Sequence, residues 1–234
     1  MYAYPEIFSK PLSLLGCGPL SVEVAEYYIK ICLQFNQIPS IHSLVDYNHP
    51  ESSSSVILQL LRSYNLNLPN LSVSFREISC DESNFLVTVA SSSSVRHRLF
   101  EELSQTGFTL PILVHPSSTV SPLARLSPGC ILAHRVVVGH NASLSPNVFV
   151  NNDSVVAHDS FLGHSTIVSP RVNISGYTTI EDDCMLYTGC VTANNAHLHK
   201  GSVISALSFY TKTRGNPYSL YMGNPARCVR NLLN

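Results

Sequence analysis

Four histidines in the second half of the chain are the side chains best suited to chemistry: His134, His140, His158 and His164. A neutral imidazole can take up a proton near pH 7, because its ordinary pKa is about 6.5, and it is also a common metal ligand. His158 differs from the others because Asp159 follows it directly and His140 lies eighteen residues before it. The pattern indicates either a general base or part of a metal site.

A six-residue repeat positions these histidines. Every sixth residue from Val120 to Ile204 is aliphatic in fourteen of fifteen cases, and Thr192 is the exception. A smaller residue, such as Ala142 or Cys184, comes four positions after each of them. Helices have a period near 3.6 and strands a period of 2, so this period fits a chain wound as a triangular prism, with three hexads to a coil. We predict a parallel β-helix of about five coils, with rungs about 4.8 Å apart.

In such a prism the four histidines share one position, two residues after an inward aliphatic, and face the surface. Residues eighteen apart stack on successive coils, so His140, His158, Gly176 and Asn194 form one column. The spacing gives one stacked histidine pair and no third ligand braced by a carboxylate. No metal is expected on this pattern, and a metal site is kept as the alternative.

Composition and charge limit the partners. The chain has 234 residues, 44% of them hydrophobic and 12% charged, with a net charge of −1 and no block of like charges. Neither nucleic acid nor an acidic membrane is an expected partner. No apolar run approaches the roughly 18 residues of a membrane span, and the N-terminus lacks a basic signal region, so we expect no membrane insertion and a cytoplasmic location. Seven cysteines without a CxxC pair favour reduced thiols over disulfides or a zinc knuckle.

The first half of the chain alternates predicted strands and helices, which implies a small, largely parallel sheet covered on both faces. Ser93 or Ser94 is expected to cap the last helix of this half. Strands are expected over residues 11–16, 40–45 and 84–90, and helices over residues 20–35, 56–64 and from Val95 to Leu103.

Two features of this half suit a nucleotide. Gly16 and Gly18 form a turn between a strand and a helix, which lets the backbone approach a phosphate and aims the first helical amides at it. Asp46 follows the second strand, where α/β sheets bind a ribose or a base. A structural turn and a solvated aspartate explain the same residues equally well.

The motifs together resemble the NeuD/PglD-like family of nucleotide-sugar acetyltransferases, typified by sialic acid O-acetyltransferase and the bacillosamine-pathway N-acetyltransferase. The glycine turn, Asp46, the Ala90-Ser91 junction with Arg96, and His115-Pro116-Ser117 fall in the family's order. The resemblance covers nearly the whole chain. Its specific part consists of Asn151, His158-Asp159, Gly163, Pro170, Gly176 and the tail Gly223-Asn224-Pro225-Ala226-Arg227.

The resemblance implies an α/β fold followed by an all-β fold. A Rossmann-like nucleotide-sugar-binding domain would span residues 1–112. A left-handed parallel β-helix of hexapeptide repeats would span residues 113–234 and end in a CoA-binding tail. The family further implies a homotrimer that holds acetyl-CoA, its co-substrate, between neighbouring subunits.

The resemblance also assigns roles to single residues. His158 would be the general base in a direct attack on the thioester, Asp159 would orient the imidazole, and the Gly176 amide would stabilise the oxyanion. The nucleotide sugar would meet Gly16, Gly18, Asp46, Ser92 and Asn151, and the CoA would meet Gly176, Met222, Gly223, Asn224, Pro225 and Ala226.

Two other functions stay open. Ile167 stands where many relatives carry a second histidine, and Glu181 and Tyr187 replace glycines that often follow the inward aliphatic. These departures suit a trimeric binding or scaffold protein without turnover. A metal-dependent hydratase, as in the hexapeptide-repeat carbonic anhydrases, is the third hypothesis.

Overall fold

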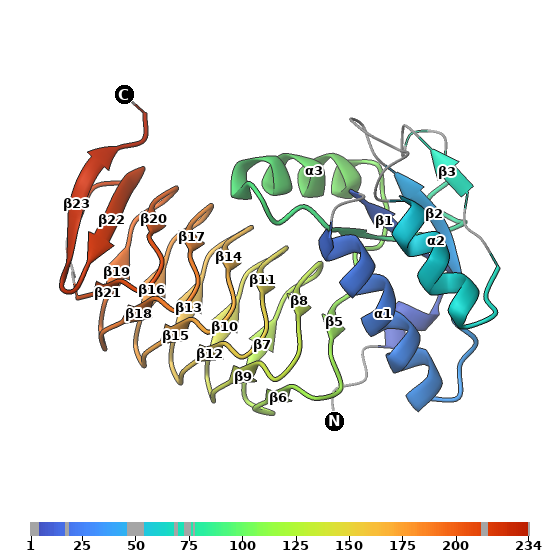
Figure 1. Cartoon of the computed structure of the whole chain (residues 1–234), viewed down its shortest axis with the longest axis horizontal. Coiled ribbons are helices and arrows are strands. Elements are labelled where there is room, and N and C mark those ends of the chain that lie inside the picture. The colour runs from blue at the N-terminus through green and yellow to red at the C-terminus, as the bar shows by residue number, and fades with distance from the viewer. Residues whose placement is uncertain are drawn as a thin grey trace. The chain divides into compact units, whose positions relative to one another are not determined.

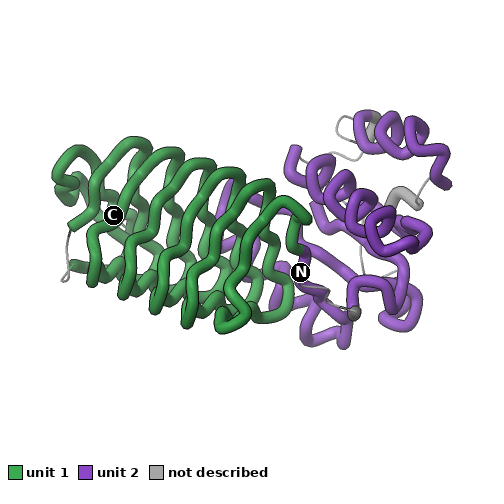
Figure 2. Tube along the Cα trace, turned by 90° about the horizontal axis from the view of Figure 1, so that it is seen from below, with its two compact units in different colours: residues 1–2, 114–234 green, residues 3–113 purple. Residues whose placement is uncertain are grey.

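The computed structural model describes residues 5–16, 19–45, 54–67, 70–72, 76, 78–211 and 215–233. The chain divides into two units, Ala3–Leu113 and Val114–Asn234, which are coloured separately in Figure 2. Among the described residues, no helix has the length and apolar character needed to cross a membrane.

The hexads form a parallel β-solenoid of about 6 turns with three sheets, which confirms the predicted period (Figure 1). Each hexad supplies a two-residue strand whose second residue points inward. Strands eighteen residues apart pair in register, as Phe149 does with Ile167. The strands are β5 (Leu113–Val114), β6 (Thr119–Val120), β7 (Arg125–Leu126), β8 (Ile131–Leu132), β9 (Val137–Val138), β10 (Ser143–Leu144), β11 (Phe149–Val150), β12 (Val155–Val156), β13 (Phe161–Leu162), β14 (Ile167–Val168), β15 (Asn173–Ile174), β16 (Thr179–Ile180), β17 (Met185–Leu186), β18 (Val191–Thr192), β19 (His197–Leu198), β20 (Val203–Ile204) and β21 (Phe209–Tyr210).

Most corners of the solenoid turn through a residue with positive φ. Asn141, Asp159 and Tyr177 have φ of 56°, 55° and 60°. A non-glycine residue rarely adopts this conformation, and Asn and Asp tolerate it best. In these corners the residue just before the one with positive φ, such as His158, stands at the first position of the corner.

The repeat continues one hexad beyond the expected end at Ile204, so that expectation was wrong. An aromatic residue, Tyr210, takes the inward place there, with its hydroxyl donating to the His197 carbonyl at 2.9 Å. Its ring contacts that of Tyr221, with 4.9 Å between centroids. Strand β22 (Ser219–Gly223) then adds to β20, and β23 (Ala226–Asn231) returns antiparallel to β22.

The unit before the solenoid contains a four-stranded parallel sheet with the order β3-β2-β1-β4. The predicted strands and helices are confirmed, with small shifts at their ends. Sequence patterns missed two short elements, η1 and β3. The elements are η1 (Pro5–Phe8), β1 (Leu12–Leu15), α1 (Pro19–Gln34), β2 (Ile41–Val45), α2 (Ser54–Ser63), β3 (Asn70–Ser72), β4 (Asn84–Val87) and α3 (Ser93–Gln105).

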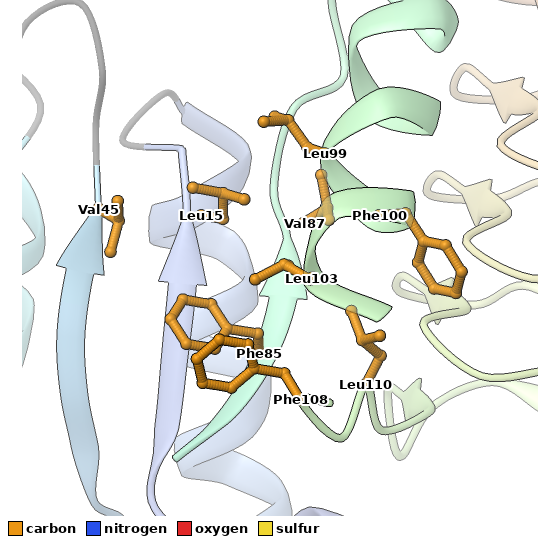
Figure 3. Packing of buried hydrophobic residues seen from close by; sticks show 9 residues of the cluster. All are labelled: Leu15, Val45, Phe85, Val87, Leu99, Phe100, Leu103, Phe108 and Leu110. Carbon is orange, nitrogen blue, oxygen red and sulfur yellow. The ribbon is translucent and has the colours of Figure 1, made fainter. Parts of the chain in front are cut away.

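An apolar cluster joins α3 to one face of this sheet (Figure 3). The rings of Phe85 and Phe108 meet edge to face, with 4.6 Å between centroids. The N-cap of α3 is Ser92, whose hydroxyl accepts from the Val95 amide at 3.4 Å, so the prediction of Ser93 or Ser94 was wrong. The cluster contains Leu15, Val45, Phe85, Val87, Leu99, Phe100, Leu103, Phe108 and Leu110.

The polar exception among the inward residues has a structural role. The Thr192 hydroxyl accepts a hydrogen bond from the Ser175 amide at 3.0 Å and lies 3.2 Å from the Thr178 hydroxyl. One coil earlier, the Ala157 amide donates instead to the Ile174 carbonyl at 2.9 Å. Thr192 thus supplies a side-chain acceptor where the backbone ladder between β15 and β18 is reduced to the pair Asn173–Val191.

We predict that Thr192→Val lowers the free energy of unfolding by about 1–3 kcal/mol, because the Ser175 amide loses its acceptor. Thr192→Ser should retain most of the stability. Thr166→Val is the matched control, since that hydroxyl only donates, to the Glu181 carbonyl at 3.2 Å, and its loss orphans no amide. Guanidinium unfolding measures all three variants. Equal stability of Thr192→Val and wild type would show that the hydroxyl is dispensable.

Candidate functional site

His158 and Asp159 form a hydrogen-bonded pair at the corner between β12 and β13. The His158 Nδ1 lies 2.9 Å from the Asp159 Oδ2. Because a carboxylate only accepts, the Nδ1–H donates, which leaves the lone pair on Nε2. The imidazole is 43% exposed, so a ligand can reach that nitrogen.

A residue of the preceding coil holds the other side of the carboxylate. The Asn141 Nδ2 donates to the Asp159 Oδ1 at 3.1 Å. The pKa of Asp159 lies below its ordinary value, first because of the hydrogen bond from His158 and then because of the one from Asn141. Asp159 is therefore ionised across the neutral range and can fix the tautomer of His158.

Two rings flank His158. The His140 imidazole stacks on it with 5.1 Å between centroids and 7° between planes. Tyr177 meets it edge to face, with 5.2 Å between centroids at 87°. Both neighbours restrict the orientation of the imidazole.

The same column also offers metal ligands. His140, His158 and Asp159 each supply one ligand atom, and these atoms all lie within 4.8 Å of one another. The predicted stacked pair of histidines is confirmed, and the spacing argument did not count the Asp159 carboxylate as a possible third ligand. The turn at Asp159 lets its carboxylate reach the preceding coil, where Oδ2 is 3.9 Å from the His140 Nε2.

Gly176 lies against the free nitrogen of His158. A β-carbon at this position would stand 2.8 Å from Nε2 and 2.7 Å from Cε1, so any side chain would push the imidazole away. Two amides at the first corner position are capped from the next coil: those of His134 and His164 donate to Asn152 at 3.0 Å and to Asp182 at 2.8 Å. Within the described part of the chain, the Gly176 amide has no such acceptor. A hydrogen-bond donor thus stands next to the basic nitrogen.

Backbone packing below His158 depends on a second glycine. A β-carbon at Gly139 would lie 2.7 Å from the His158 amide nitrogen. Glycine is needed there for the two coils to approach closely.

Asn151 lies at a different corner of the solenoid from His158. It follows β11, and its Oδ1 accepts from the Asn152 amide at 2.7 Å. Within one chain, the structure does not bring this predicted substrate residue to the His158 corner.

The predicted CoA-binding tail forms the turn between β22 and β23. Met222 is 44% exposed and Ala226 is buried. The Gly223 amide donates to the Ser208 hydroxyl at 2.9 Å, and the Asn224–Pro225 peptide is cis. The turn belongs to the sheet of β20, so it too lies away from the His158 corner.

The predicted nucleotide residues are only partly described. Gly16 has φ of 112°, its amide donates to the Val45 carbonyl at 2.7 Å, and its own carbonyl accepts from the Thr88 hydroxyl at 2.9 Å. The Ser92 hydroxyl is engaged as the cap of α3. Gly18 and Asp46 lie outside the described residues.

Sequence reasoning missed Asn141 and Tyr177. Both stand eighteen residues from Asp159, one before it and one after. Extending the phase analysis from the His158 column to the neighbouring Asp159 column would have found them.

Comparison with solved structures identifies the fold. No protein-family model matches the chain, and no curated protein matches its sequence. The acetyltransferase domain of PglB from Neisseria gonorrhoeae is similar over 94% of this chain and 100% of that one, with a TM-score of 0.79 and 24% identity. The same domain in complex with acetyl coenzyme A gives a TM-score of 0.71 at 23% identity, covering 94% and 99% of the two chains. PerB from Caulobacter crescentus, in complex with CoA and GDP-perosamine, gives 0.69 at 21% identity, covering 93% and 96%.

We predict that the Asp159 carboxyl titrates below the ordinary midpoint of about 3.9. Asn141→Ala should raise that midpoint, because it removes one hydrogen bond to the charged form. A depressed folded pKa adds stability above the unfolded pKa and loses it as the pH falls through the folded pKa, so the contribution disappears in acid. Carbon NMR of labelled aspartates, assigned with Asp159→Asn, gives the midpoints. Identical midpoints in the wild type and Asn141→Ala would contradict this account.

Proposed function

We propose that this protein is an acetyltransferase that moves the acetyl group of acetyl-CoA to an amino or hydroxyl group of a nucleotide-linked sugar. The observation that carries the proposal is the arrangement of His158: Asp159 holds Nδ1, and Nε2 faces Gly176, which has no side chain. This geometry suits a general base beside an oxyanion donor. The fold shared with PglB and PerB supports the same chemistry.

The proposed reaction is one direct displacement. The acceptor nitrogen or oxygen attacks the thioester carbonyl carbon while the His158 Nε2 takes its proton. The tetrahedral intermediate places its negative oxygen at the Gly176 amide. The carbon–sulfur bond then breaks, and the CoA thiolate leaves and recovers the proton from the imidazolium. Asp159 stabilises that imidazolium and keeps the ring in place.

We propose a homotrimer of left-handed prisms because the site is incomplete in one chain. The base stands at one corner, whereas Asn151 and the β22–β23 turn lie elsewhere on the solenoid. A neighbouring copy would bring its Asn151 and its turn, residues 222–226, to the His158 corner. Acetyl-CoA would then lie between two subunits.

The nucleotide sugar is assigned to a Rossmann-like domain over residues 1–112. Its parallel strand order, β3-β2-β1-β4, is the order in which doubly wound nucleotide-binding sheets begin. Gly16 directly follows β1 and has positive φ, a conformation that glycine allows where the backbone turns close to a ligand. Gly18, Asp46 and Ser92 complete this part of the proposal.

A cytoplasmic location is consistent with the cysteines. The described ones are all free thiols, and four of them are buried. Such usage is typical of a reducing compartment.

A metal-dependent hydratase is the second candidate, and the cluster of His140, His158 and Asp159 favours it. The hydrogen bond between the His158 Nδ1 and Asp159 gives the acetyltransferase precedence, because a metal held between these two groups would have to replace the proton that they share.

We predict that His158→Ala lowers kcat/KM for acetyl transfer by about 10²–10⁴-fold and leaves the oligomer intact. His164→Ala, at the same hexad position on a third corner, is the matched control and should retain activity. The assay follows CoA thiol release with a panel of amino-sugar nucleotides, and sedimentation follows the oligomer. If the wild type neither releases CoA nor binds acetyl-CoA in calorimetry, a scaffold protein is the better interpretation.

We predict that Gly176→Ala lowers kcat/KM by about 10²-fold, because a methyl group displaces the imidazole by a fraction of an ångström. Its backbone conformation is open to alanine, so the melting temperature should change little. An unchanged kcat/KM would remove Gly176 from the site.

Mixing two inactive variants tests the shared site. His158→Ala and Asn151→Ala subunits, unfolded and refolded together, should recover about a quarter of wild-type activity, because a quarter of the interfaces in random trimers pair two intact halves. Each variant refolded alone is the control. No recovery in a mixed trimer would place both residues in one subunit's site.

A further inference from the structure

A second cluster of ligating side chains lies on the sheet that contains β16 and β19 (Figure 1). His197 and His199 are two residues apart, so they point to the same, outward face, with Leu198 buried between them. Glu181 lies on the neighbouring rung, where Ile180 pairs with Leu198. Glu181 therefore stands beside His199 and diagonally from His197.

These three side chains converge on one point. The Glu181 Oε1 is 2.7 Å from the His197 Nε2 and 3.1 Å from the His199 Nδ1. The two imidazoles stack with 4.3 Å between centroids. One ligand atom from each of the three residues lies within 4.8 Å of the others.

We propose that Glu181, His197 and His199 bind a divalent transition metal, with zinc as the best match. Two histidines and one glutamate are a common zinc ligand set, and their ligand atoms lie about 3.3 Å apart around a tetrahedral ion with bonds near 2.0–2.1 Å. The Glu181 oxygen lies 2.7 Å and 3.1 Å from the two histidine nitrogens, so these side chains need to move apart only slightly to admit the ion. The side chains are 37%, 36% and 23% exposed, which leaves a fourth position for water or a ligand oxygen.

Neighbouring groups hold the Glu181 carboxylate in place and keep it ionised. Its second oxygen, Oε2, accepts from the Lys200 amide at 2.9 Å, which fixes the orientation of the carboxylate as an outer-shell hydrogen bond does in metal sites. Burial raises the pKa of Glu181, but the hydrogen bonds from the Lys200 amide, His197 and His199 together lower it below the ordinary value. The Lys200 ammonium lies 3.6 Å from the Asp183 carboxylate, and this carboxylate offsets the positive charge of the lysine near the proposed metal.

The site is distinct from the proposed catalytic one. The cluster of Glu181, His197 and His199 shares no residue with the cluster of His140, His158 and Asp159. Metal binding here does not rest on the proposed function, and either can fail alone.

Calorimetry with Zn²⁺ and visible absorption with Co²⁺ on the full-length chain test the proposal. His197→Ala and His199→Ala should each weaken Zn²⁺ binding at least about tenfold, since even outer-shell changes cost that much. Glu181→Gln should weaken it too. His140→Ala and Asp159→Asn are the matched controls, because they disable the other ligand cluster and should leave the affinity unchanged.

Nitrogen NMR of the wild type serves as a second measurement in case a variant does not fold. Zn²⁺ should shift the ligating nitrogens of His197 and His199 and not those of His140. The absence of Zn²⁺ binding, or its loss in His140→Ala with retention in His197→Ala, would overturn the proposal.

Discussion

The hydrogen-bonded ladder between coils is the constraint on which this molecule depends. Each strand pairs in register with the strand eighteen residues away, so every side chain stands directly above or below its equivalents in the next coil. The buried column and the surface columns follow from that one spacing. Because of this ladder, residues eighteen apart in the sequence stack on one another, and this is why His140, His158 and Gly176 meet.

Much of the solenoid could be predicted for that reason. The period alone located the inward residues, and phase alone placed Gly176 next to His158. Other features depend on local geometry that the period does not encode. The positive φ of Asp159 sends its carboxylate back toward His140 and Asn141, and no hexad count shows that. The sequence pattern did not predict the last hexad, because its inward residue, Tyr210, is aromatic and the pattern counted only aliphatic residues.

The N-terminal unit was predictable at the level of elements but less so at the level of contacts. Its strands and helices have clear patterns, whereas a cap depends on one hydroxyl. Four consecutive serines, residues 91–94, offered the same chemistry at the start of α3, and only the backbone conformation at Ser92 selects it. The proposed nucleotide contacts depend on loops, where sequence spacing gives order along the chain but little about position in space.

Thr192 shows how an irregularity in the repeat bears on the site. Its hydroxyl binds the Ser175 amide, which directly precedes Gly176. A valine here would restore the apolar column but remove the acceptor from the corner that carries Gly176, the proposed oxyanion donor. From the following coil, Thr192 therefore holds the backbone of the corner that carries Gly176. One polar residue in the buried column thus fixes the backbone next to His158, which an apolar side chain at this position would not do.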